Sequence, residues 1–170
     1  IKTDLAQSSE KVVIEQALKK RKELVEAYKK VGVAINPLIL IQLPDRKTST
    51  EDELKERVEK ILDTNGIKLK NQKLAIHLSG HHENLEDISK NDSEVEVLIF
   101  KQAIALGWDC PRAQILVLFR QWHSPVFSIQ TVGRIMRMPE PDKGHYGNDV
   151  LNHAYVYTNL ENIDIAEDVA

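Results

Sequence analysis

The chain contains the run Pro37-Leu38-Ile39-Leu40-Ile41-Gln42-Leu43, which is almost continuous in leucine and isoleucine and is closed by Pro44-Asp45. A strand with one face in water alternates apolar and polar residues, whereas a strand of a parallel sheet is covered on both faces and is apolar throughout. The run therefore predicts a strand that is buried on both faces.

Helical patterns lie on both sides of this strand. Residues 9–31 place apolar side chains at offsets of three and four, with Lys and Glu between them, and Gly32 stops the pattern. Thr50 and Glu53 form a capping box that opens a second helix, and Asn65-Gly66 ends its pattern. Both segments are predicted to be amphipathic helices that bury one stripe each.

Further strands and one further helix complete the pattern. The helix begins at Ser124-Pro125, a favourable start, and Pro139 closes it. The additional predicted strands are 74–78, 95–100, 115–119 and 154–157. Strands separated by helices or long crossings predict an α/β fold, with a mostly parallel sheet flanked by helices. We expect one folding unit over residues 1–170, with a leading helix within 1–32 and a sheet core over 37–158.

Composition excludes several classes of protein. The chain has 170 residues, 42% of them hydrophobic and 29% charged, which is typical of a compact domain. No apolar run approaches the roughly 18–20 residues of a membrane span, so no membrane partner is expected. The single cysteine, Cys110, excludes an internal disulfide and favours a reducing compartment. We interpret His77, His81 and His82 as solvated loop histidines, and Cys110 as a packed side chain, rather than as metal ligands.

Positive charge is concentrated in one segment. The whole chain carries a net charge of −3, but residues 100–137 carry +4 and the remainder −7. The charged residues of this segment are Lys101, Arg112, Arg120, Arg134 and Arg137, against Asp109. Such polarisation indicates an edge that meets phosphate groups on an otherwise acidic protein.

The helix that begins at Ser124 has an unusual face. Gln130, Arg134 and Arg137 lie at offsets of four and three, so they share one side of the helix. Gly133 in a helix interior costs about 1 kcal/mol relative to Ala. Neighbouring arginines and a missing Cβ both favour a bound anion, because guanidinium groups fit phosphate oxygens and glycine permits close approach. A surface helix with a packing glycine is the alternative.

The run Gln130-Thr131-Val132-Gly133-Arg134-Ile135-Met136-Arg137 resembles motif VI of superfamily 2 helicases and translocases. Upstream, residues 103–111 resemble motif V, with a Gly-x-Asp-x-Pro ending, and residues 37–45 lie where motif IV would fall. The resemblance implies a RecA-like, P-loop NTPase-like fold: the second, C-terminal lobe of a helicase motor.

A narrower resemblance is to the restriction (Res) subunit of type III restriction-modification enzymes. It rests on residues 97–114 and 130–140, above all on Phe100-Lys101-Gln102 and on the Arg-Met-Pro-Glu ending of motif VI. It implies an ATP- and Mg²⁺-dependent motor on double-stranded DNA, in the bacterial cytoplasm. Its implied partners are a methyltransferase (modification) subunit and, in the same chain, a first RecA-like lobe and a nuclease domain, so that unmodified foreign DNA is cleaved.

The resemblance also implies roles for residues at the ATP site. Arg137 would be the arginine finger on the γ-phosphate, with Arg134 and Gln130 beside it as catalytic residues. Asp109 would meet the ribose, and Gly107 would shape the turn. Gly133, Arg134 and Arg137 would belong to the nucleotide-binding surface together with Gly107 and Asp109. A finger arginine contributes roughly 10³–10⁵ in rate to phosphoryl transfer.

DNA would be contacted from a second set of positions. The resemblance implies that Lys101 contacts a backbone phosphate, with Gln102 and Gln42 as further nucleic-acid contacts. The chain has no G-x-x-x-x-G-K-[ST] loop and no Walker B pair, so half of the ATP site is expected outside it. We therefore expect these 170 residues alone neither to hydrolyse ATP nor to cut DNA. The lobe of another superfamily 2 helicase, or a non-catalytic interaction module, remains an alternative.

Overall fold

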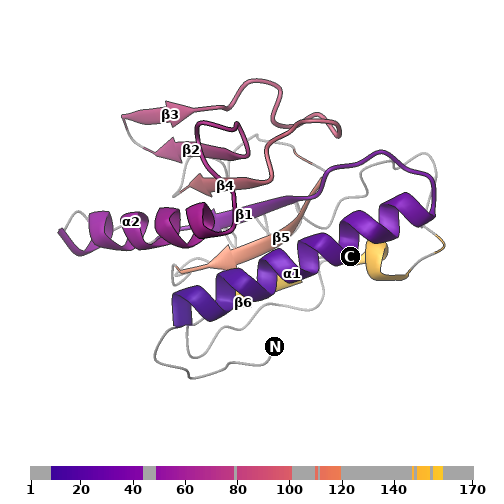
Figure 1. The fold of residues 1–170 in the computed structure, drawn as a ribbon, viewed down its shortest axis with the longest axis horizontal. Coiled ribbons are helices and arrows are strands. Elements are labelled where there is room, and N and C mark those ends of the chain that lie inside the picture. Colours follow the sequence, from indigo (N-terminus) through magenta and orange to yellow (C-terminus); the bar gives the residue numbers. More distant parts are fainter. Residues whose placement is uncertain are drawn as a thin grey trace, which may run out of the picture.

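The computed structural model describes residues 9–43, 49–78, 80–100, 110, 112–119, 147, 149–153 and 155–158 (Figure 1). Within these residues, helices and strands alternate along most of the chain. Their order is α1 (Ser9–Lys30), β1 (Leu38–Gln42), α2 (Ser49–Thr64), β2 (Leu74–Leu78), β3 (His81–Glu83), β4 (Val97–Phe100), β5 (Ala113–Leu118), the 3₁₀ helix η3 (Asp149–Asn152) and β6 (Tyr155–Thr158). The predicted third helix, over 124–139, lies outside the described residues.

The strands form one six-stranded sheet in the order β3-β2-β4-β1-β5-β6. Every neighbouring pair is parallel except β2 and β3, which form an antiparallel hairpin at one edge. All five residues of β1 are buried, which confirms the strand predicted from the apolar run. The α/β class with a mostly parallel sheet is thereby confirmed.

Two helices cover one face of this sheet and end where the sequence predicts. In Figure 1, α1 and α2 lie in front of the strands. Each is followed by a glycine with positive φ, Gly32 at 74° and Gly66 at 78°. The next amide donates back to the final turn, from Val33 to the Tyr28 carbonyl at 3.0 Å and from Ile67 to that of Leu62 at 2.9 Å. This is the Schellman arrangement, which satisfies carbonyls that a helix end leaves open.

The core has two layers, one on each side of the sheet. Side chains of α1 and α2, such as Leu24 and Val58, pack on one face against alternate strand residues such as Ile39 and Ile99. The opposite layer holds Leu38, Leu40, Ala75, Leu98, Phe100 and Leu116, packed with Ile88, Val95 and Cys110. Because strand side chains alternate between faces, this division also assigns each strand residue to one face.

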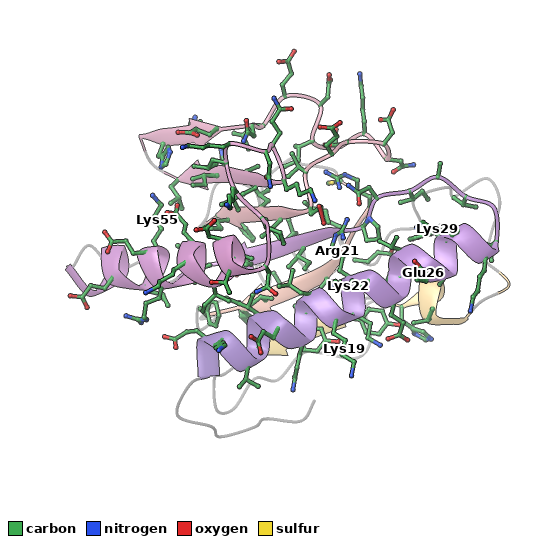
Figure 2. The ribbon with its side chains drawn as sticks, in the orientation of Figure 1. Lys19, Arg21, Lys22, Glu26, Lys29 and Lys55 are labelled. Atoms are coloured by element: carbon green, nitrogen blue, oxygen red, sulfur yellow. The ribbon has the colours of Figure 1, made fainter. Side chains whose placement is uncertain are left out.

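Arg21 ties α1 to the amino ends of the strands. Its Nε donates to the Pro37 carbonyl at 2.9 Å, and a terminal nitrogen lies 2.8 Å from a Glu96 carboxylate oxygen. Burial lowers the pKa of Arg21, and the charge of Glu96 opposes this shift. Figure 2 shows Arg21 beside the sheet, whereas the labelled Lys19 and Lys22 lie on the exposed side of α1. The helix is therefore fixed by an ion pair as well as by apolar packing.

Histidine placement and several strand bounds differ from the expectations drawn from sequence; β4, for example, begins at Val97 rather than at residue 95. His81 and His82 lie on strand β3, so the interpretation of these two as loop residues was wrong, whereas His77 lies on β2, within the strand predicted over 74–78. The strand β5 begins at Ala113, two residues earlier than predicted. In the described part of the chain, no helix has the length and apolar composition that a bilayer span requires.

Candidate functional site

Almost all of the predicted site lies outside the described residues. The exception is Gln42, the last residue of β1. The predicted residues whose placement the structure does not describe are Lys101, Gln102, Gly107, Asp109, Gln130, Gly133, Arg134 and Arg137. Their roles stay predictions. What the structure does describe is the edge of the sheet from which the segments containing them depart.

This edge is formed by the carboxyl ends of the parallel strands. Gln42 pairs with Phe100 on one side and with Leu118 on the other. The amide of Leu43 donates to the Phe100 carbonyl at 2.9 Å, and that of Phe119 to the Gln42 carbonyl at 3.0 Å. The ends of β1, β4 and β5 are thus joined residue by residue at the point where Lys101 continues the chain from Phe100.

At this edge the strand order of the sheet reverses, between the strands on one side of β1 and those on the other. From β1 the chain passes to β2 and back to β4 on one side of β1, and then crosses to β5 and β6 on the other. In open α/β sheets, ligands bind outside the carboxyl ends of strands at such a reversal of strand order. Both the strand order and the motif positions therefore direct attention to this edge.

Gln42 lies at the edge but is fully buried, with 0% of its surface exposed. Its side chain faces the layer that contains Leu38 and Leu40, two and four residues earlier on the same strand. The Gln42 side chain therefore packs inside the protein, beneath the carboxyl edge of the sheet. A direct contact between Gln42 and a nucleic acid stays a prediction.

On the face of the sheet that carries Leu38 and Leu40, paired residues form a row that crosses the strands. The register joins His82 to His77, His77 to Phe100, and Phe100 to Gln42. The rings of His77 and His82 are stacked, with centroids 4.7 Å apart and planes inclined by 29°. His82 is exposed and His77 is partly buried, so the row passes from a buried amide to an aromatic pair whose outer member lies at the surface.

On the opposite face, Lys55 and His81 brace the same hairpin. Lys55 reaches from α2 toward β3 (Figure 2), and its Nζ lies 3.2 Å from Nδ1 of His81. The other ring nitrogen of His81 lies 2.9 Å from a Glu83 carboxylate oxygen. His81 therefore has partners on both nitrogens, and α2 holds the hairpin from behind the stacked pair.

Arg112 is placed differently from its sequence-based interpretation as a phosphate-facing cation. It is 0% exposed and precedes β5, so it lies at the amino edge of the sheet, opposite the strand ends described above. Its guanidinium donates to the carbonyls of Ile88, Asn36 and Val95 at 2.7–2.8 Å. Burial lowers the pKa of Arg112 to about 10. This cation is structural, so one positive charge fewer is available to an anion.

The sequence prediction omitted the histidine pair from the site. The available signal was His77, the one polar residue in the otherwise apolar strand Leu74–Leu78. His82 gave no periodic signal, because β3 has only three residues. Cys110 is buried as expected, and its Sγ lies 3.7 Å from the Ile88 carbonyl. Among the described residues, no group of three or more His, Cys, Asp or Glu side chains could hold a metal ion.

Comparison with known proteins was made for both sequence and structure. Residues 19–139 match the family model of the helicase conserved C-terminal domain. The structure is similar to the crystal structure of the C-terminal part of the Fun30 ATPase domain, with 19% identity and a TM-score of 0.46. That similarity covers 82% of this chain and 40% of the other. No curated protein sequence matches the chain.

Proposed function

The protein belongs to the helicase conserved C-terminal domain family, since the family model matches most of the chain, and we propose that it works as the second motor lobe of a type III restriction enzyme. The family and the fold make it the C-terminal, RecA-like lobe of a superfamily 2 helicase or translocase. The proposal adds the substrate, double-stranded DNA, and the reaction, ATP-driven movement that leads to cleavage of unmodified foreign DNA.

One observation carries the motor role: the register that joins the ends of β1, β4 and β5. Gln42, Phe100 and Leu118 are paired across these three strands. The chain continues directly from Phe100 into Lys101 and motif V. A motor lobe needs its nucleotide and nucleic-acid segments to leave one rigid platform, because a shift at one is then transmitted to the other. The paired strand ends supply such a platform.

The ATP-site proposal concerns residues of motifs V and VI. Arg137 is the arginine finger that stabilises charge on the γ-phosphate, and Arg134 and Gln130 assist it. Asp109 binds the ribose, with Gly107 and Gly133 allowing close approach of the backbone. Mg²⁺ and the other phosphates are held by a first lobe, because this chain has no phosphate-binding loop of the Walker type.

The DNA-site proposal concerns Lys101 and Gln102, which immediately follow the buried end of β4. Lys101 neutralises a backbone phosphate. The type III assignment rests on Phe100, the residue before Lys101, because most superfamily 2 motors have a small residue at this position. Phe100 is 1% exposed and packs in the layer with Leu98 and Leu116. The bulky ring thus shapes the edge from which the chain continues into Lys101.

Replacement of the finger tests the motor role. In the full-length protein that carries this chain, Arg137→Ala should lower DNA-stimulated ATP hydrolysis at least about 10³-fold while leaving ATP binding intact. Arg57→Ala is the matched control, since this arginine is half-exposed on α2 and pairs with Glu10 at 2.9 Å. Turnover of Arg137→Ala that equals the control would reject the finger assignment.

A separate measurement tests the type III assignment. The full-length protein, mixed with its proposed methyltransferase partner, should cleave unmodified duplex DNA only when ATP and Mg²⁺ are present. DNA-stimulated ATPase without cleavage under these conditions would reject the restriction role and retain the motor role. The 170-residue chain alone should show neither activity.

A further inference from the structure

The stacked pair of His77 and His82 has properties that sheet stability alone does not require. The centroid separation of 4.7 Å lies within the range for favourable offset stacking of aromatic rings. His82 is exposed and lies on β3, a strand at one edge of the sheet (Figure 1). The pair therefore offers an aromatic surface to solvent beside the carboxyl edge.

Its position relative to the proposed DNA contacts follows from the register. His77 pairs with Phe100, the residue before Lys101, so one strand spacing of about 4.8 Å separates the two backbones. From β3 to β1 the row spans three such spacings, about 14 Å. Successive nucleotides of one strand are separated by about 3.4 Å along a duplex axis, so the row matches about four nucleotides. A nucleic-acid strand that passes the described end of β4 at Phe100 can therefore reach the histidine pair.

The protonation state of His77 bears on which part of a nucleotide the stacked rings suit. Burial, and after it the neighbouring His82, lower the pKa of His77. Nδ1 of His77 is buried and makes no hydrogen bond. A ring that is uncharged near neutral pH attracts a phosphate weakly but retains a π-face, and histidine is among the side chains on which unpaired bases stack. Base stacking fits these observations better than phosphate binding does.

We propose that the stacked His77–His82 pair is a platform for a base of a single-stranded segment of nucleic acid that crosses the carboxyl edge of the sheet. The proposal rests on the proposed motor function, because that function brings a nucleic acid to Lys101. Each base adds affinity through its π-face, so the contact is independent of base sequence. Lys55 and His81 support the platform from the opposite face through the 3.2 Å contact described above.

The test separates stacking from phosphate attraction. Binding of the full-length protein is measured by fluorescence anisotropy with a labelled oligothymidylate of about 20 nucleotides and with an abasic oligomer of equal length. His82→Ala should weaken binding to oligothymidylate about tenfold and leave binding to the abasic oligomer unchanged. His82→Phe, which keeps an aromatic ring, should bind oligothymidylate as the wild type does.

The matched control is His153→Ala, an exposed histidine just before β6, at the opposite, amino edge of the sheet. It should bind both oligomers normally. Equal affinity of His82→Ala and wild type for oligothymidylate, or an equal loss on both oligomers, would overturn the platform while leaving the motor role intact. Failure of the wild-type protein to bind oligothymidylate would likewise overturn the platform, whereas the motor role on double-stranded DNA is decided separately by the ATPase measurement on Arg137→Ala. Unchanged thermal unfolding of His82→Ala would confirm that the comparison concerns binding.

Discussion

Arg112 offers the most direct test of how this fold is held together. Replacement by Ala removes three donors from the carbonyls of Ile88, Asn36 and Val95. These carbonyls belong to the chain before β1 and to the segment before β4, which lie side by side at the amino edge. The side chain is 0% exposed, so water does not readily replace it. We expect Arg112→Ala to lower the free energy of unfolding.

The magnitude follows from two opposing contributions. A buried carbonyl that loses its donor costs ~2 kcal/mol, so the three acceptors together cost about 6 kcal/mol. Burial lowers the pKa of Arg112 to about 10, and a shift of this size corresponds to a burial cost of about 3 kcal/mol for its charge in the folded protein. Removing the side chain relieves this cost. The net destabilisation is therefore about 3 kcal/mol.

Urea denaturation of the wild type and variant measures this difference directly. The midpoint should fall while the m-value stays unchanged, because the surface exposed on unfolding is nearly the same. Hydrogen exchange should also accelerate at the amides of 88–95, which Arg112 holds. Arg57→Ala, at an exposed ion pair, should change the free energy of unfolding by less than about 1 kcal/mol. If the two variants are equally stable, the anchoring role of Arg112 is refuted.

Two further predictions concern other charged and titratable groups. The losses of unfolding free energy caused by Arg21→Ala and Glu96→Ala should be non-additive, because the 2.8 Å ion pair between these residues is largely buried. A double-mutant cycle should give a coupling free energy of about 1–3 kcal/mol. Additive losses would contradict this prediction. Because the pKa of His77 is lowered in the folded protein, the folded protein binds a proton at His77 less readily than the unfolded chain does. The contribution of neutral His77 to stability is therefore present above about pH 6.5. It is lost as the pH falls through the lower pKa of the folded state. Urea titrations between about pH 7 and pH 5 should therefore give a shallower pH dependence for His77→Gln than for the wild type, and identical slopes would show that His77 is not desolvated.

Sequence reasoning succeeded where local pattern and burial agree. The apolar residues of β1 are consistent with only one environment, a strand covered on both faces, and the helix stops at Gly32 and Gly66 carry their own conformational signal. It failed at β3, because three polar residues have no period and the strand exists only through pairing with β2.

The site was less predictable from sequence for a similar reason. Counting charges treated Arg112 as one of several surface cations, because sequence does not reveal which arginine is enclosed by carbonyls from distant segments. The pairing of His77 with His82 depends on the turn between β2 and β3. The motif residues within 101–109 and 130–137 lie outside the described residues, so their predicted roles await the experiments above.

The central place of β1 also has a consequence for how the chain folds. This strand is made before its two neighbours, β4 and β5, which follow about 55 to 80 residues later. Until β4 has been made, this almost entirely apolar strand has no partner on either edge, and until β5 has been made it lacks a partner on one edge. Such pairing between distant segments slows folding and leaves aggregation-prone intermediates. The central position of β1 gives the finished sheet a rigid centre. It also means that the nascent chain cannot bury β1 on both edges until β5 has been synthesised as far as Leu118.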